Sequence, residues 1–417
     1  MLSIAIVRAR YNPHGGAERF VQRALAALSD HEVALTVIAR DWPKAAAAES
    51  PVDLHLERVD PFYLGSVWRD WSFERGVKRL LARRRFDLVQ SHERIAGLPV
   101  YRAGDGVHAE FLAQRRRALP AWKRWTVWAN PYHAHMVRTE RRMFTDPALQ
   151  AVICNSTMVR GEIAQRFGVP PGKMHLIRNG VDLRRFGPAS PAQRAQARAA
   201  YGLPEAATVF AFVGSGFERK GLGCAIRALA RLFAAGARPA AAAAVAPVAG
   251  GMQPSGTRDA RLLVAGSDRH AGSYRRLAER LGVASRITFL GGVDDVRPVL
   301  HASDVFVLPT LYDPFPNSAL EALACGLPVV TSTKSGAAEM IRPGENGRVI
   351  DALDVPALAE AMDDLSDPPR MAARRDSARR SVAALTIEGL GDDLVALYRR
   401  LLDSARADTP LLESAGP

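Results

Sequence analysis

Residues 208–233, TVFAFVGSGFERKGLGCAIRALARLF, contain the three parts of one β–loop–α unit. The apolar run Thr208–Val213 predicts a buried strand, and Leu222–Phe233 predicts a helix. Between them lies the glycine-rich loop Gly214–Gly221. A strand that leads through such a loop into a helix is typical of α/β proteins with a parallel sheet.

The same alternation of strands and helices continues on both sides of this unit. Downstream, strands are expected at 261–265, 287–289, 305–308 and 328–331, and helices at 274–281 and 318–325. Upstream, strands are expected at 2–7, 33–38, 87–90, 152–154 and 175–177, and a helix at 17–28. The pattern predicts two α/β halves in series, joined near residues 187–196.

This division assigns residues 1–187 to an N-terminal domain and 197–385 to a C-terminal domain. The Ala-, Gly- and Pro-rich stretch 234–259 has no periodicity and is expected to be a disordered surface insertion. Residues 386–403 are expected to form a C-terminal helix that packs back on the N-terminal domain, followed by a tail at 404–417.

Composition excludes several classes of protein. With 48% hydrophobic and 24% charged residues, the chain has a globular composition. No segment approaches the roughly 18 apolar residues of a membrane span, and residues 1–10 lack the basic region of a signal peptide. The distant cysteines Cys154, Cys224 and Cys325 argue against a zinc site or a disulfide framework and fit a reducing cytoplasm.

The net charge of +13 lies in the first half of the chain. Residues 1–200 hold 32 basic and 18 acidic residues, whereas the remainder holds 24 and 25. The densest segment, residues 111–144, has eight basic residues against the single acid Glu140. Its tryptophans, Trp122, Trp125 and Trp128, recur every third residue, so a helix would align them on one side.

Three interpretations of this segment compete: a solvated helix with core tryptophans, a nucleic-acid site, and a membrane-surface helix. No nucleic-acid motif accompanies the charge, so nucleic acid is not expected as a partner. Tryptophan favours the headgroup layer and clustered cations attract anionic lipid, which favours membrane docking. The residues expected to dock are Arg115, Arg116, Arg117, Trp122, Lys123, Arg124 and Trp125.

Two glycine-containing loops are candidates for binding phosphate. Gly15 and Gly16 separate a predicted strand from a helix, where backbone can approach an anion, although an ordinary βα turn would look the same. The loop 214–221 is neither a Walker A loop nor a complete dinucleotide fingerprint. Its adjacent Arg219 and Lys220 can clamp a diphosphate, or they can form a solvated basic pair.

A third motif, residues 312–322 with the sequence YDPFPNSALEA, follows a predicted strand and opens a helix. Asp313 and Glu321 are eight positions apart and can accept hydrogen bonds from the hydroxyls of a sugar. They can equally serve as a helix cap and a partner of the helix dipole. The chain has no Asp-x-Asp metal motif, so cationic side chains would have to neutralise a leaving diphosphate.

With Asp313 and Glu321 in its acidic positions, this motif resembles the E-x7-E signature of the retaining glycosyltransferases of family 4. Asp313 is one methylene shorter than the usual glutamate, a difference that bears on the donor sugar. Further motifs resemble that family in the same order: GGAER at 15–19, NGVD at 179–182 with Arg185-Phe186, GSGFERKG at 214–221, LPVV at 327–330 and GENG at 344–347.

The resemblance implies the GT-B fold, in which two Rossmann-like, doubly wound domains face a central cleft. It also implies a nucleotide-sugar donor, expected to be UDP-glucose, and retaining transfer without a metal or other cofactor. Arg219 and Lys220 would hold the diphosphate, Asp313 the donor sugar and Glu321 the ribose. Further donor contacts would come from Gly15, Gly16, Gly214, Ser215, Val293, Asn317, Ser318 and Ala319. From the N-terminal domain Asp105 would face the donor sugar, with His108 as the alternative.

Within the family, residues 101–110, YRAGDGVHAE, and the basic segment after them resemble the lipopolysaccharide core glucosyltransferase I most closely. This implies a glycolipid acceptor of a bacterial cell envelope and a peripheral position on the inner face of the cytoplasmic membrane.

Other functions fit parts of the pattern. A non-hydrolysing nucleotide-sugar epimerase has the same two-domain fold, and a family 4 transferase with another sugar donor has the same motifs. A dehydrogenase would need a complete G-x-G-x-x-G, which we do not find. A non-enzymatic membrane scaffold would have no use for the phosphate loop.

Overall fold

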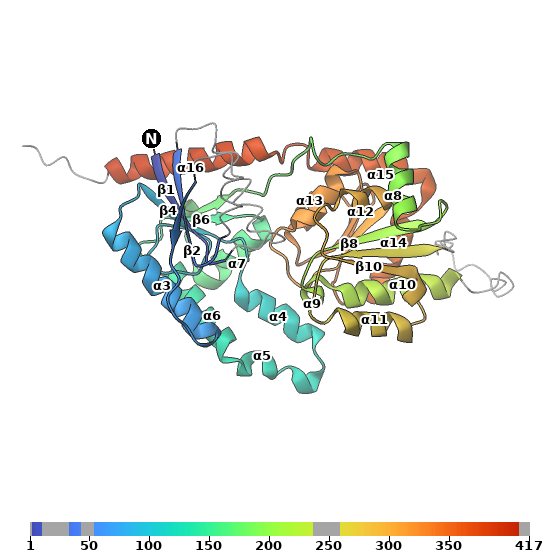
Figure 1. Cartoon of the computed structure of the whole chain (residues 1–417), viewed down its shortest axis with the longest axis horizontal. Helices are drawn as coiled ribbons and strands as arrows, with labels where there is room; N and C mark the ends of the chain where they lie inside the picture. The colour runs from blue at the N-terminus through green and yellow to red at the C-terminus, as the bar shows by residue number, and fades with distance from the viewer. Residues whose placement is uncertain (1, 11–32, 43–53, 237–258, 408–417) are drawn as a thin grey trace, which may run out of the picture. The chain divides into compact units, whose positions relative to one another are not determined.

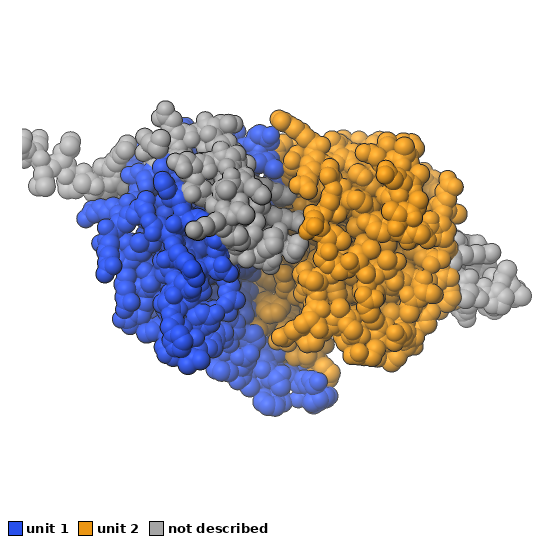
Figure 2. Space-filling view, viewed as in Figure 1, with its two compact units in different colours: residues 1–109, 122–180, 387–417 blue, residues 110–121, 181–386 orange. Residues whose placement is uncertain are grey.

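The computed structural model describes residues 2–10, 33–42, 54–236 and 259–407. Each half of the chain forms its own α/β unit around one parallel sheet (Figure 1). Figure 2 shows the two units: unit 1 consists of residues 1–109, 122–180 and 387–417, and unit 2 of residues 110–121 and 181–386. Gly15, Gly16, the expected helix at 17–28, most of the expected insertion and residues 408–417 lie outside the described residues.

The described strands of unit 1 form a parallel sheet in the order β3-β2-β1-β4-β5-β6-β7. They are β1 (Leu2–Val7), β2 (Val33–Ala39), β3 (Leu54–Arg58), β4 (Leu88–Ser91), β5 (Val100–Arg102), β6 (Ala151–Cys154) and β7 (Met174–Leu176). The helices of unit 1 include α3 (Gly65–Arg83), α5 (Thr126–Ala129), α6 (Pro131–Phe144), α7 (Thr157–Phe167) and α16 (Ile387–Ala407). Helix α4 (His108–Ala118) begins in unit 1 and belongs to unit 2 from Glu110 onwards. Leu394 and Leu397 of α16 belong to the same buried cluster as Ile4 and Ile6 of β1, which makes the last helix part of this core.

Unit 2 has a parallel sheet in the order β10-β9-β8-β11-β12-β13. Its strands are β8 (Thr208–Val213), β9 (Ala260–Ala265), β10 (Ile287–Gly291), β11 (Val305–Leu308), β12 (Val329–Ser332) and β13 (Gly347–Ile350). Its helices include α8 (Pro191–Ala200), α9 (Phe217–Lys220), α10 (Leu222–Gly236), α11 (Ala271–Arg280), α12 (Arg297–Ala302), α13 (Asn317–Ala324), α14 (Val355–Leu365) and α15 (Pro368–Ser381). The two Rossmann-like parallel sheets confirm the predicted fold class.

The segment 111–144 differs from the single helix that its tryptophan spacing suggested. Helix α4 ends before Pro120, a 3-10 turn covers Ala121–Lys123, and α5 and α6 follow as separate helices. Pro131 stands at the first position of α6, where a missing N–H costs nothing, and the Asn130 side chain caps that helix. The prolines therefore divide the segment, and its first part, Glu110–Ala121, groups with unit 2.

Candidate functional site

In unit 2 the strand order changes direction between β8 and β11. The loops that leave the carboxyl ends of these two neighbouring strands diverge, which is where open α/β sheets bind ligands. The loop after β8 carries Arg219 and Lys220, and the loop after β11 carries Asp313. The fold thus brings three predicted site residues to one point.

These three side chains form a charged cluster. The Lys220 ammonium makes an ion pair with Asp313 Oδ2, and Arg219 Nη1 lies 3.9 Å from the same oxygen. Arg219 Nη1 also donates to the Tyr312 carbonyl at 3.4 Å. Burial lowers the pKa of Lys220, and the nearby Arg219 acts in the same direction while Asp313 opposes both. The cluster has two cations and one anion, a charge suited to a diphosphate.

Close backbone packing holds the two loops together. The Arg219 carbonyl accepts hydrogen bonds from Leu311 N at 2.7 Å and from Thr310 Oγ1 at 2.9 Å. Gly221 has φ +81°, and a Cβ there would lie 1.9 Å from the Pro309 carbonyl oxygen. Only glycine fits this position, because both its conformation and the space around it exclude a side chain.

A third segment fixes the backbone of Asp313. Its N–H donates to the Lys334 carbonyl at 2.9 Å, and its carbonyl accepts from Gly336 N at 2.9 Å. Between these two lies Ser335, which the sequence analysis missed. Its Oγ is buried and has no hydrogen-bond partner among the described residues. A buried hydroxyl without a partner is unfavourable and marks a position where a ligand can complete the bonding.

The other predicted donor contacts lie on the same unit. Gly214 follows β8, and the aliphatic carbons of Lys220 occupy the space beside it, with Cε 3.3 Å from where a Cβ would stand. Ser215 is exposed, and its Oγ accepts a hydrogen bond from Ser267 N at 3.3 Å. Val293 is half-buried in the loop after β10, at the edge of the sheet.

Helix α13 begins at the end of the Asp313 loop. Asn317, Ala319 and Glu321 are buried and Ser318 is half-buried. The Ala319 N–H donates to the Pro316 carbonyl at 3.1 Å, so this donor is used within the first turn. Glu321 lies one turn into the helix, and only 1% of its surface is exposed.

The two alternatives in unit 1, Asp105 and His108, have different surroundings. The Asp105 side chain is 53% exposed, with Oδ2 3.8 Å from Arg8 Nη1. His108 opens α4, and its Nε2 lies 3.1 Å from His133 Nδ1. Burial lowers the pKa of His108 to about 3, and Arg94 and His133 act in the same direction. His108 is therefore a neutral, half-buried member of a histidine pair, whereas Asp105 is an accessible carboxylate.

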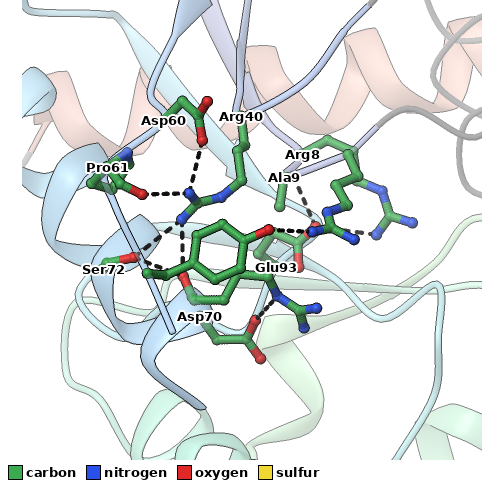
Figure 3. A network of polar contacts seen from close by, with 11 residues as sticks. Arg8, Ala9, Arg40, Asp60, Pro61, Asp70, Ser72 and Glu93 are labelled. Carbon is green, nitrogen blue, oxygen red and sulfur yellow. Dashed lines mark hydrogen bonds and ion pairs between the residues drawn. The ribbon is translucent and has the colours of Figure 1, made fainter. Parts of the chain in front are cut away.

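Around the carboxyl ends of β1 and β2 lies a polar network that the sequence analysis did not predict (Figure 3). Glu93 accepts hydrogen bonds from Arg8 Nη1 at 3.3 Å and from Ala9 N at 3.0 Å. Arg40 is buried and donates to Asp60 Oδ1 at 2.9 Å, the Pro61 carbonyl at 2.7 Å, the Arg69 carbonyl at 3.0 Å and Ser72 Oγ at 3.2 Å. The network ties the start of α3 to the sheet.

The expected docking residues separate into two groups. Within unit 2, Arg115 Nε pairs with Glu218 Oε1 at 3.0 Å and Arg117 Nη2 with Asp351 Oδ2 at 2.7 Å. Within unit 1, Trp122 and Trp125 are 70% and 67% exposed. Arg124 of unit 1 is exposed, and the Lys123 ammonium lies 4.5 Å from the centre of the Trp122 ring. Arg116 is also exposed but belongs to unit 2.

The described part of the chain contains no group of three His, Cys, Asp or Glu side chains arranged to hold a metal ion. None of its helices is long and apolar enough to cross a bilayer.

Two family models match the chain in succession. The one described as Glycosyltransferase Family 4 matches residues 14–185, and the one described as Glycosyl transferases group 1 matches residues 207–367. The D-inositol 3-phosphate glycosyltransferase of Rhodococcus opacus (strain B4) is 32% identical over 251 residues, 60% of this chain and 52% of that protein. The chain thus spans about half the length of the curated relatives it matches.

Two solved structures are similar over nearly their whole length. WaaG, a glycosyltransferase involved in lipopolysaccharide biosynthesis, has a TM-score of 0.76 at 23% identity, covering 95% of this chain and 99% of WaaG. Anabaena HepE in complex with UDP-glucose has a TM-score of 0.70 at 19% identity, covering 97% and 100%. These likenesses show the fold. They do not confirm that the chain resembles the lipopolysaccharide core glucosyltransferase I more than other members of family 4, which stays a prediction. Residues 14–185 thus match a model of glycosyltransferase family 4, residues 207–367 match one of glycosyl transferases group 1, and the chain has the GT-B fold.

Proposed function

We propose that this protein is a retaining glycosyltransferase that uses a nucleotide-sugar donor, UDP-glucose. The observation that carries the proposal is the cluster of Arg219, Lys220 and Asp313 where the strand order of the second sheet changes direction. The two family domains and the binding of UDP-glucose by HepE support the same reaction class.

The cluster suits the charge that develops when a sugar leaves a nucleoside diphosphate. As the glycosidic bond breaks, negative charge grows on the departing phosphate, and fixed cations stabilise it most in a site that excludes water. Lys220 is buried and already positioned by Asp313, so it needs little rearrangement. Arg219 is 41% exposed and can turn its planar guanidinium to a phosphate.

The remaining roles follow from chemistry and position. The Asp313 carboxylate accepts hydrogen bonds from donor-sugar hydroxyls, and Glu321 binds the ribose. In the reaction proposed, the acceptor attacks on the face from which the phosphate departs, and that phosphate takes the acceptor's proton. The anomeric configuration is thereby retained, with no metal required to neutralise the leaving group.

For the acceptor we propose a glycolipid of a bacterial envelope, such as a lipopolysaccharide core, reached from the cytoplasmic face of the membrane. The exposed Trp122 and Trp125 beside Lys123 and Arg124 favour a lipid surface. A second candidate is a phosphorylated cyclitol, because the relative in Rhodococcus opacus is a D-inositol 3-phosphate glycosyltransferase.

A donor and acceptor screen tests the proposal. UDP-, GDP- and ADP-sugars are offered with lipid A-core or inositol 3-phosphate, and nucleotide release is measured with and without acceptor. Acceptor-dependent release of UDP from UDP-glucose is expected, whereas epimerised donor without transfer would identify an epimerase. Lys220→Ala should abolish transfer, while Arg280→Ala, which removes an exposed arginine of α11, should not. Near-normal turnover by Lys220→Ala would refute the site.

A further inference from the structure

One part of unit 1 exposes an unusual number of large apolar side chains. The chain has six tryptophans, and five of them, Trp68, Trp71, Trp122, Trp125 and Trp128, are between 42% and 70% exposed. Phe62 and Leu64 are exposed by 73% and 68%. Isolated apolar residues are common on surfaces, but a group of this size marks an interaction site.

The exposed residues belong to two segments that meet at α6. Both α3 and α5 pack against α6, and α3 and α6 lie side by side in Figure 1. The Arg69 side chain, between Trp68 and Trp71, lies close enough to Tyr132 in the first turn of α6 for the two to interact electrostatically. Tyr132 follows Trp128 by four residues, so this proximity links the aromatic start of α3 to the end of the tryptophan segment.

The start of α3 has an apolar stripe that faces solvent. Leu64, Val67, Trp68 and Trp71 have the spacing i, i+3, i+4, i+7 and are all exposed, while Phe73 and Val77 are buried in the core. The same stripe becomes basic further along the helix, with Arg75, Lys78 and Arg79 exposed.

Acidic and basic side chains both lie beside the start of this stripe, whereas the exposed charged side chains that follow it are basic. The Arg75 guanidinium lies 4.8 Å from the centre of the Trp71 ring. Asp70 is bound by Arg69 at 2.8 Å, and Glu74 by Lys78 at 2.7 Å and by Arg142. Both acids on this side of the helix are thus neutralised by neighbouring cations.

The stripe is held in place by the network of Figure 3. Arg40 donates to the carbonyls of Pro61 and Arg69 and to Ser72 Oγ, and its guanidinium lies 4.6 Å from the centre of the Tyr63 ring. Pro61 and Tyr63, on the two sides of Phe62, therefore both contact Arg40, the residue that follows β2. Apolar side chains held in solvent in this way are preorganised for a partner.

We infer that this surface of unit 1 docks on an anionic lipid bilayer through two helical segments. The first is Phe62–Trp71 of the α3 start, which the sequence did not suggest, and the second is Trp122–Trp128. The aromatic rings enter the headgroup layer, and Arg75, Arg79, Lys123 and Arg124 meet the anionic headgroups. Arg115 and Arg117 are not part of this surface, because they pair with acids of unit 2. This docking surface rests on the membrane location proposed above. It adds the segment Phe62–Trp71 to the tryptophan segment Trp122–Trp128.

Vesicle binding by paired variants tests the inference. Trp68→Ser/Trp71→Ser and Trp122→Ser/Trp125→Ser are compared with Leu281→Ser, which changes an exposed apolar residue of unit 2. Binding is measured with vesicles of phosphatidylcholine alone and mixed with phosphatidylglycerol. Each tryptophan pair should weaken binding to the anionic vesicles by roughly tenfold, and Leu281→Ser should not.

The outcomes separate this inference from the function proposed above. If only Trp122→Ser/Trp125→Ser weakens binding, the α3 half of the surface is refuted. If the wild type is a dimer that Trp68→Ser/Trp71→Ser converts to a monomer without any effect on vesicles, the stripe binds a second copy instead. UDP affinity measured in solution should be unchanged in Trp68→Ser/Trp71→Ser, which shows that the variant is folded. Loss of transfer in Lys220→Ala with intact vesicle binding leaves the docking surface unaffected.

Discussion

The Lys220 ammonium and the Asp313 carboxylate form a buried ion pair between residues that are 93 positions apart in the sequence. Removing one partner of such a pair leaves a desolvated charge behind. Asp313→Asn should therefore lower the free energy of unfolding by about 3 kcal/mol. Urea denaturation of Asp313→Asn, Lys220→Met and the double variant measures the coupling. If the single losses simply add in the double variant, the two side chains are not coupled.

Gly221 offers a test of the close approach between the phosphate loop and the strand end at Pro309. Gly221→Ala places a Cβ 1.9 Å from a backbone oxygen, so the loops must separate. We expect a loss of stability above 2 kcal/mol, together with a large loss of transfer activity. Gly216→Ala is the matched control, because its φ is +77° but no atom lies within 4 Å of the new Cβ. Gly216→Ala should lower the free energy of unfolding by only about 1 kcal/mol. If both variants lose the same stability, the steric contact at Pro309 is unimportant.

The stability of the fold should depend on pH through His108. Its pKa is about 3 in the folded protein, against 6.5 for an ordinary histidine, so between these values the unfolded chain binds more protons. The free energy of unfolding should then fall as the pH decreases from about 6.5 towards 3, and His108 should add no slope above that range. Buried His92, whose pKa is also lowered, contributes with the same sign.

His108→Asn should flatten this pH dependence without removing it. Urea titrations at several pH values measure the slope, with His270→Asn, at an exposed position, as the control. A slope identical to that of the wild type would contradict the assignment of the effect to His108.

The parallel strands were predictable where both faces of a strand are apolar. Val305–Leu308 is buried along its whole length and was expected at these residues. The edge strands β3 and β13 were missed, because Leu54–Arg58 alternates apolar and polar residues and Gly347–Ile350 is mostly half-buried. The central strand β5 was also missed, because its buried run Val100–Arg102 has only three residues and ends in an arginine.

The candidate site was predictable residue by residue but not as an arrangement. Motif spacing singled out Arg219, Lys220 and Asp313 separately, and only the fold shows that the acid binds the lysine. Clustered basic residues together with the tryptophan spacing indicated the docking segment, so it included Arg115, which pairs with Glu218. It also passed over Trp68, whose exposure depends on which side of α3 meets the core.

Ser335 is the residue beside Asp313 whose role sequence patterns could not suggest. Its buried hydroxyl has no partner among the described residues, so Ser335→Ala should not lower the free energy of unfolding. If a donor hydroxyl completes this bonding, the variant should raise the KM for UDP-glucose severalfold. Ser332→Ala is the contrast, because Ser332 Oγ donates to the Thr310 carbonyl at 2.5 Å and its loss should cost about 1 kcal/mol. An unchanged KM in Ser335→Ala would mean that the donor does not reach this hydroxyl, and destabilisation would mean that the hydroxyl is already bonded in the folded chain.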